Sequence, residues 1–148
     1  HSQGALLALK LCTTGYAQTS ISLMGVCDTI EGLERKKALI GINSAIGSTA
    51  ERPFVLLPNG LRFVYSNEFF TDFKIWNVPD LLAMHRGASL FISASDDSLI
   101  SSRETQIGFS AAHEPKKLLT IQDSHNFSEE NARLIAHAIR DWLETIKQ

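Results

Sequence analysis

The stretch ASLFISA, residues 88–94, is the sequence feature that most restricts the fold of this chain. It runs through seven residues without a charge or a clear alternation of apolar and polar side chains. Such a run is typical of a strand buried on both faces, which occurs mainly in parallel sheets covered by helices. Two further short apolar runs, at 20–28 and 116–123, predict two more buried strands.

Helical patterns separate these strands, at 3–14, 30–47, 102–112 and 128–146. In 3–14 the apolar side chains, Leu7 and Leu11 among them, are spread widely enough to predict a buried helix. In 128–146, Ser128 is a candidate helix cap ahead of an apolar stripe. The alternation of helices and strands predicts an α/β fold with parallel strands and flanking helices.

The region between residues 28 and 85 has a different pattern and is predicted to be an insertion. FVLL-PNG-LRFVYS, at 54–66, has the turn residues and alternation of a β-hairpin, and short helical patterns follow it. An excess of aromatic residues here favours either packing of the insertion or an apolar wall for a substrate group. The candidate substrate-binding residues are Phe63, Tyr65, Phe69, Phe70 and Trp76.

Composition excludes several classes of partner. The 148 residues suit one domain, and a net charge of −2 gives no basic surface for nucleic acid or anionic membranes. No apolar run is long enough to span a membrane, and no signal peptide is evident, so we expect a cytoplasmic protein. Cys12 and Cys27 lack zinc-ligand spacing and the histidines form no cluster, so we expect two buried thiols and no metal.

Polar residues with catalytic potential occur where helix or strand patterns meet loops. In parallel sheets such residues gather at the carboxyl ends of the strands. Ser2 precedes the first helix, Asp96 and Asp97 follow the strand at 88–94, and His125 follows the strand at 116–123. A serine nucleophile needs a base such as histidine, which a carboxylate then orients. Ser2 as a simple helix cap, and Asp96 as the acid, remain open.

The order Ser, Asp, His is that of α/β-hydrolases, and the chain resembles the carboxyl-terminal part of such a serine hydrolase over essentially all 148 residues. HSQG matches the last four residues of the G-x-S-x-G nucleophile elbow, while LFISASDDSLIS and LLTIQDSHNF resemble the segments with the acid and the histidine. Ser93-Ala94, Ala88 and Ser101 depart from the family pattern at scaffold positions. The insertion is similar to that of small-lid esterases of the cinnamoyl or feruloyl type and of lysophospholipase or peptidase relatives.

This resemblance implies a serine hydrolase that cleaves carboxylic esters through an acyl-enzyme. Ser2, Asp97 and His125 would be catalytic, the Gln3 N–H would be an oxyanion donor, and residues 28–85 would form a lid. Residues 1–148 would then be a single incomplete domain that begins at the elbow and lacks the amino-terminal half of the fold. The implied partners are a small ester and either that missing half or a second copy at the open sheet edge, with no cofactor. A peptidase, a lysophospholipase or a noncatalytic fragment are the alternatives.

Overall fold

The computed structural model describes residues 1–32, 34, 38, 49, 52–56 and 60–147. The chain divides into two compact units: His1–Asp28 with Val78–Gln148, and Thr29–Asn77. In chain order the elements are α1 (Gln3–Thr13), β1 (Thr19–Leu23), β2 (Phe54–Leu56), β3 (Arg62–Val64), α3 (Asn67–Ile75), α4 (Val78–Met84), β4 (Ala88–Ala94), α5 (Ser102–Ala111), β5 (Lys116–Ile121) and α6 (Glu129–Thr145).

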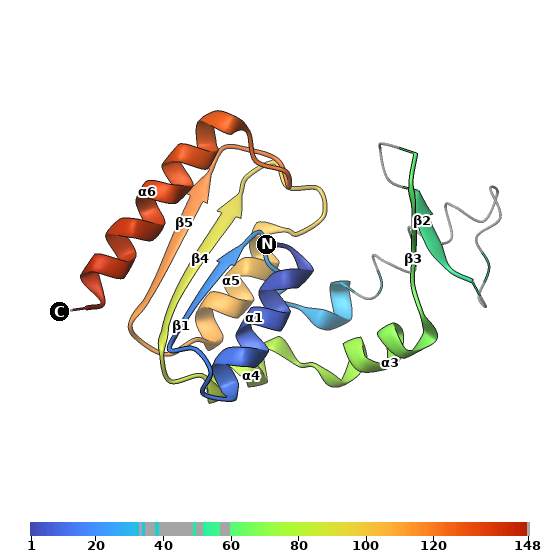
Figure 1. Cartoon of the computed structure of the whole chain (residues 1–148), viewed down its shortest axis with the longest axis horizontal. Helices are drawn as coiled ribbons and strands as arrows, with labels where there is room; N and C mark the ends of the chain where they lie inside the picture. Colours follow the sequence, from blue (N-terminus) through green and yellow to red (C-terminus); the bar gives the residue numbers. More distant parts are fainter. Residues whose placement is uncertain (33, 35–37, 39–48, 50–51, 57–59, 148) are drawn as a thin grey trace. The chain divides into compact units, whose positions relative to one another are not determined.

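The first unit is built on a parallel three-stranded sheet with the order β1-β4-β5 (Figure 1). β4 is the central strand, and all seven of its residues are buried, which confirms the prediction from ASLFISA. Ile92 of β4 stands opposite Leu23 of β1 and Leu119 of β5. β1 has a neighbour on one side only among the described residues, so it lies at an edge of the sheet.

Helices cover both faces of this sheet, as predicted. Side chains of a strand alternate between the two faces. Leu90 and Ile92 join Ile135 and Trp142 in one buried apolar cluster beneath α6. Phe91 points to the opposite face, where its ring meets that of Phe109 on α5 at 5.9 Å. Figure 1 shows α6 on one side of the sheet and α1, α4 and α5 on the other.

The strand predicted over 20–28 is wrong at its carboxyl end, because β1 stops at Leu23. Met24 has φ 42°, a conformation that no strand residue adopts, and the chain turns there. The backbone N–H groups of Cys27 and Asp28 then donate to the carboxylate of Glu104, which is fully buried. Of the helix predicted over 30–47, residues 30–32 are helical, and nearly all of the rest lies outside the described residues.

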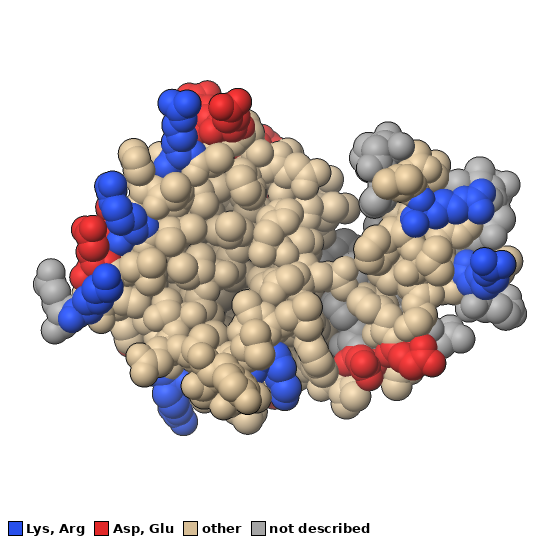
Figure 2. Space-filling model, viewed as in Figure 1, with Lys and Arg blue, Asp and Glu red and all other residues tan. Residues whose placement is uncertain are grey.

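The prediction of a buried first helix is wrong for one face of α1. Leu6 and Leu9 of α1 are buried against the sheet, whereas Leu7 is 57% exposed and Leu11 is 54% exposed. These two leucines are four residues apart and therefore lie on one face of the helix. In Figure 2 the charged side chains of the first unit gather mainly over α6 and along the rim, and the surface over α1 is largely uncharged.

The second unit contains the predicted hairpin and the first of the two short helices. β2 and β3 pair antiparallel, with Val55 opposite Phe63. The Ser66 hydroxyl caps α3 by accepting the N–H of Phe69. This unit is shorter than the predicted lid of 28–85, because α4 packs against α1 and α5 of the first unit. Of the helices in the described ranges, none combines the length and the apolarity of a membrane span.

Candidate active site

Ser2 sits in a strained turn at the start of α1. Its backbone has φ 51° and ψ −128°, which side-chain-bearing residues rarely adopt and which clusters at functional sites. The turn is fixed by the Ser2 N–H, which donates to the carbonyl of Leu23 at the end of β1 over 2.9 Å. Ser2 occupies the N-cap position, yet its side chain makes no capping hydrogen bond. The simple helix-cap interpretation of Ser2 is therefore wrong.

The Ser2 hydroxyl is engaged instead by His125. Ser2 Oγ lies 3.0 Å from His125 Nε2, and His125 Nδ1 lies 2.8 Å from Asp97 Oδ2. The ionised carboxylate can only accept, so Nδ1 carries the proton and donates to Asp97. In the neutral imidazole Nε2 is then an acceptor, and the Ser2 O–H donates to it. The three side chains thus form one hydrogen-bonded chain that ends at a hydroxyl.

The structure distinguishes Asp97 from Asp96. The Asp97 side chain is 1% exposed, and its second oxygen accepts the backbone N–H groups of Leu99 and Ile100 at 2.8 and 2.9 Å. These bonds hold the carboxylate in one orientation toward His125. Asp96 is exposed, and its N–H donates to the carbonyl of Asp123 on the neighbouring loop. Only Asp97 of the two contacts the imidazole.

Gln3 is the first residue of α1 and immediately follows Ser2. The first N–H groups of a helix have no carbonyl one turn earlier to bind, and they lie at the positive end of the helix dipole. The Gln3 N–H therefore suits the binding of an anionic oxygen beside the Ser2 hydroxyl. The predicted oxyanion donor, the Gln3 N–H, therefore lies at the amino-terminal end of α1, directly after Ser2.

Asp123, which was not among the residues predicted from the sequence, organises the loop that carries His125. Its carboxylate accepts the N–H and hydroxyl of Ser128, the N–H of Ser124 and the side-chain amide of Asn131. The Ser128 N–H, followed by Asn131 and the Ser124 N–H, lowers the pKa of Asp123 from 3.8 to about 2. The sequence signal for this role is the position of Asp123, five residues before the helix-capping Ser128.

The predicted substrate-binding residues all belong to the second unit, whereas Ser2, Asp97 and His125 belong to the first. The rings of Phe63 and Tyr65 are 5.0 Å apart, and those of Tyr65 and Phe69 are 4.8 Å apart. Burial raises the pKa of Tyr65. Trp76 is half-buried just after α3, and Phe70 lies within α3. Three of the five residues therefore form one aromatic group within this unit.

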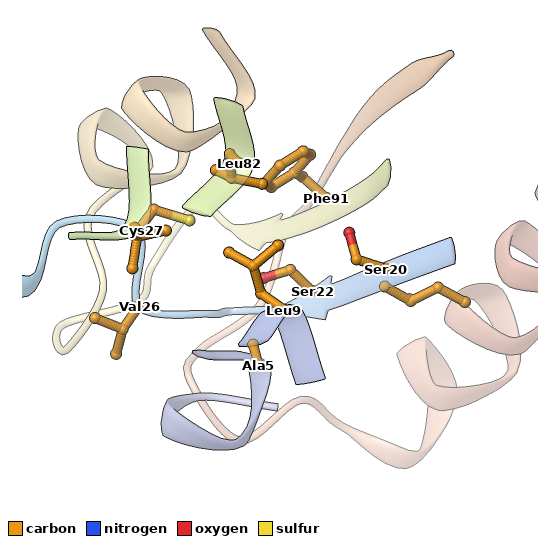
Figure 3. Close-up of a pocket in the computed structure, with 10 residues that line it drawn as sticks. Ala5, Leu9, Ser20, Ser22, Val26, Cys27, Leu82 and Phe91 are labelled. Carbon is orange, nitrogen blue, oxygen red and sulfur yellow. The ribbon is translucent and has the colours of Figure 1, made fainter. Parts of the chain in front are cut away.

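One small, largely apolar pocket of the first unit does not suit a substrate. Its volume is about 10 Å³, and Figure 3 shows it among side chains of α1, β1, α4 and β4. A cavity of this size holds about one water molecule. Leu9, Leu82, Phe91 and Val26 make its walls largely apolar. We therefore interpret it as a small packing defect behind the sheet.

Both cysteines are buried and unpaired by any disulfide, as the sequence predicts. Burial, with added repulsion from Glu104 and Asp28, raises the pKa of Cys27 to about 12. Burial also raises the pKa of Cys12. Within the described ranges, no three His, Cys, Asp or Glu side chains are grouped so that they could hold a metal ion.

The parallel sheet, its helical layers and the strained serine turn after which α1 begins define a partial α/β-hydrolase fold. Solved structures share it. The esterase domain of a Rhodothermus marinus protein is 18% identical, with a TM-score of 0.75 over 96% of this chain and 57% of that chain. The α/β hydrolase GrgF from Penicillium is 12% identical, with a TM-score of 0.70 over 98% of this chain and 61% of that one.

A third such structure is Est1E from Butyrivibrio proteoclasticus with ferulic acid bound. It is 15% identical, with a TM-score of 0.66 over 99% of this chain and 57% of that one. The present chain thus spans only 57% to 61% of the length of these three structures. No protein-family model and no curated protein matches the sequence. At these identities the comparisons establish the fold.

Proposed function

We propose that this chain carries the catalytic residues of a serine hydrolase that cleaves carboxylic esters. The observation on which this rests is the hydrogen-bonded chain from Asp97 through His125 to Ser2, with distances of 2.8 and 3.0 Å. A hydroxyl with an ordinary pKa needs such a base within hydrogen-bond reach before it attacks a carbonyl carbon. The strained turn at Ser2 presents the hydroxyl at the end of a helix, as in a nucleophile elbow.

The proposed reaction has two stages. Ser2 Oγ attacks the acyl carbon of the ester, and its proton passes to His125 Nε2. The Gln3 N–H stabilises the oxyanion of the tetrahedral intermediate. The His125 imidazolium then protonates the departing alcohol, which leaves an acyl group on Ser2. A water molecule then attacks this acyl-enzyme while its proton passes to His125 Nε2. His125 returns the proton to Ser2 Oγ as the carboxylic acid leaves.

Asp97 has an orienting role in this proposal. Its carboxylate holds the proton of His125 on Nδ1, which leaves Nε2 to receive the proton of Ser2. Because the N–H groups of Leu99 and Ile100 fix the other oxygen, Asp97 does not rotate away from His125. The carboxylate also stabilises the imidazolium that forms in the transition state.

We further propose that residues 1–148 are the part of a longer hydrolase that runs from the nucleophile to the last helix. Support comes from the solved structures, of which the chain spans about three fifths, and from β1, which lies at an edge of the sheet in the part of the chain that the structure describes. The exposed Leu7 and Leu11 of α1 provide apolar surface for further structure to cover. A second oxyanion donor would come from that upstream part.

The second unit is proposed to act as the lid. Its group of Phe63, Tyr65 and Phe69 offers an apolar surface for an acyl or aromatic part of the substrate. Trp76 and Phe70 complete the set proposed for this role. Est1E was solved with ferulic acid bound, which makes aromatic acyl esters the first compounds to try.

The test is a panel of p-nitrophenyl esters, anilides and lysophospholipids, assayed on the longest natural form of the protein. We expect ester hydrolysis that disappears in Ser2→Ala and persists in Ser110→Ala, a matched change at an exposed position of α5. Preferential cleavage of anilides would replace the proposed substrate class by amides. Preferential cleavage of lysophospholipids would narrow the proposed class to lysophospholipid esters. Equal ester hydrolysis by Ser2→Ala and the parent protein would refute the nucleophile assignment.

A further inference from the structure

The residue before the serine makes contacts that the proposed reaction does not use. Nε2 of His1 lies 2.9 Å from the backbone carbonyl oxygen of His125. The His1 ring stands 4.9 Å from the His125 ring, and it meets the ring of Phe127 edge-on at 5.9 Å with an interplanar angle of 87°. His1 is therefore held between the backbone and the side chains of the loop that follows β5.

We propose that His1 is a positioning residue that fixes His125 against Ser2, an inference that rests on the proposed function. A carbonyl oxygen only accepts, so Nε2 of His1 must carry the proton and donate. The bond therefore selects one tautomer of the neutral ring. Because His1 and Ser2 are adjacent in the chain, this bond holds the backbone of His125 close to the residue that carries the nucleophile.

Within the described part of the chain, the other contacts of the loop between β5 and α6 fix its neighbouring residues and the His125 ring, but not the backbone of His125. His125 lies between β5 and α6, outside regular secondary structure. Asp123 holds the loop on either side of His125, through the N–H groups of Ser124 and Ser128. Asp97 and Ser2 hold the two nitrogens of the His125 ring. The bond from His1 is made at the backbone of His125 itself.

Losing this bond is expected to affect the chemical step more than substrate binding. A displacement of about 1 Å in a reacting group costs up to about 100-fold in rate. His1 contacts the backbone and ring of His125 and the ring of Phe127, so its removal changes proton transfer at Ser2. The expected signature is a lower kcat with little change in KM.

Three substitutions test the geometry. His1→Gln places an amide N–H near the position of Nε2, whereas His1→Asn places one near Nδ1, too far back to reach the His125 carbonyl. We expect His1→Gln to keep kcat within about 3-fold of the parent. We expect His1→Asn and His1→Ala to lose about 10-fold to 100-fold in kcat with KM within about 2-fold. If His1→Ala does not fold, the Gln and Asn pair carries the comparison.

Equal kcat in His1→Gln and His1→Asn would overturn the proposal, and so would a rise in KM at unchanged kcat. A second readout does not depend on activity: the low-field proton NMR signal of the His125 Nδ1–H bonded to Asp97. We expect faster exchange of this proton with water in His1→Asn than in His1→Gln. An inactive parent protein that still shows this difference would refute the proposed hydrolase while leaving the positioning role intact.

Discussion

His125 Nε2 lies 3.0 Å from Ser2 Oγ, although the two residues are 123 positions apart in the chain. The parallel sheet brings them together, because each lies where a strand ends at its carboxyl edge. The Ser2 N–H binds Leu23 at the end of β1, and His125 follows β5. Asp97 follows β4, the central strand, and completes the group.

Replacing Asp97 by Asn should lower kcat by roughly 10⁴-fold, as the equivalent change does in a characterised serine protease. The amide donates where the carboxylate accepted, so His125 would turn to the tautomer that cannot take the proton of Ser2. Steady-state kinetics with an ester substrate measure the effect. Asp96→Asn is the matched control and should leave kcat nearly unchanged. The reverse pattern would reassign the acid to Asp96.

Asp123→Asn should destabilise the protein in a pH-dependent way. The folded-state pKa of about 2 lies below the usual value for aspartate, so the ionised carboxylate stabilises the fold above about pH 4. This stabilisation is lost as the pH falls from about 4 to about 2. Urea unfolding at a series of pH values should show a gap between the parent and the variant at pH 7 that closes toward pH 2.

The control for this experiment is Asp141→Asn, on the exposed face of α6. Asp141 pairs with Arg140 at 3.3 Å, and both side chains are more than 60% exposed. Exposed pairs of this kind contribute little to stability. A gap for Asp123→Asn that stays constant over the whole pH range would show that the carboxylate charge is not what holds the loop.

The thiol of Cys27 should be inert in the native protein. Its pKa of about 12 leaves almost no thiolate at pH 8, and the thiolate is the reactive form. Cys27 is also 2% exposed. We expect no reaction with a thiol reagent at pH 8 until a denaturant is added, after which both Cys27 and Cys12 should react. Rapid labelling of Cys27 in the folded protein would contradict its described environment.

Gly25→Ala should destabilise the fold by about 1–3 kcal/mol through overpacking. A Cβ added at Gly25 would collide with the Ser22 side chain and would lie 2.7 Å from Cβ of Ala5 on α1. The turn after β1 then has to move away from α1. Gly4→Ala is the control, since a Cβ there meets nothing within 4 Å among the described residues. Thermal or urea unfolding should show a loss of stability in Gly25→Ala and none in Gly4→Ala, because alanine suits a helix better than glycine. An equal loss in both variants would contradict the clash.

Much of the fold follows from sequence patterns that depend on burial. ASLFISA predicted a strand buried on both faces, and Ser128 with the apolar stripe behind it predicted α6. The end of β1 was not predictable in this way, because the residue with the positive φ is Met24 and not a glycine, so the sequence carries no turn signal there. The exposure of Leu7 and Leu11 was missed because apolar residues alone do not reveal which face is covered.

The residues of the candidate site also fall into those that the sequence predicted and those that it did not. Ser2, Asp97 and His125 were found because chain order and loop position carry information about a parallel sheet. The preference for Asp97 over Asp96 needed the family resemblance, and the structure supplies its contacts. Asp123 and His1 were missed because their roles depend on hydrogen bonds to backbone groups, which leave only a weak trace in the sequence.

The most direct test of the account is to map the site that a fluorophosphonate modifies. The reagent phosphonylates a serine only where a base activates its hydroxyl, and peptide mass spectrometry then identifies the serine. We expect one stoichiometric adduct, on Ser2, that is absent in Ser2→Ala and forms much more slowly in His125→Gln. An adduct on a different serine, or no adduct on the folded full-length protein, would contradict the assignment of Ser2, His125 and Asp97 as catalytic residues.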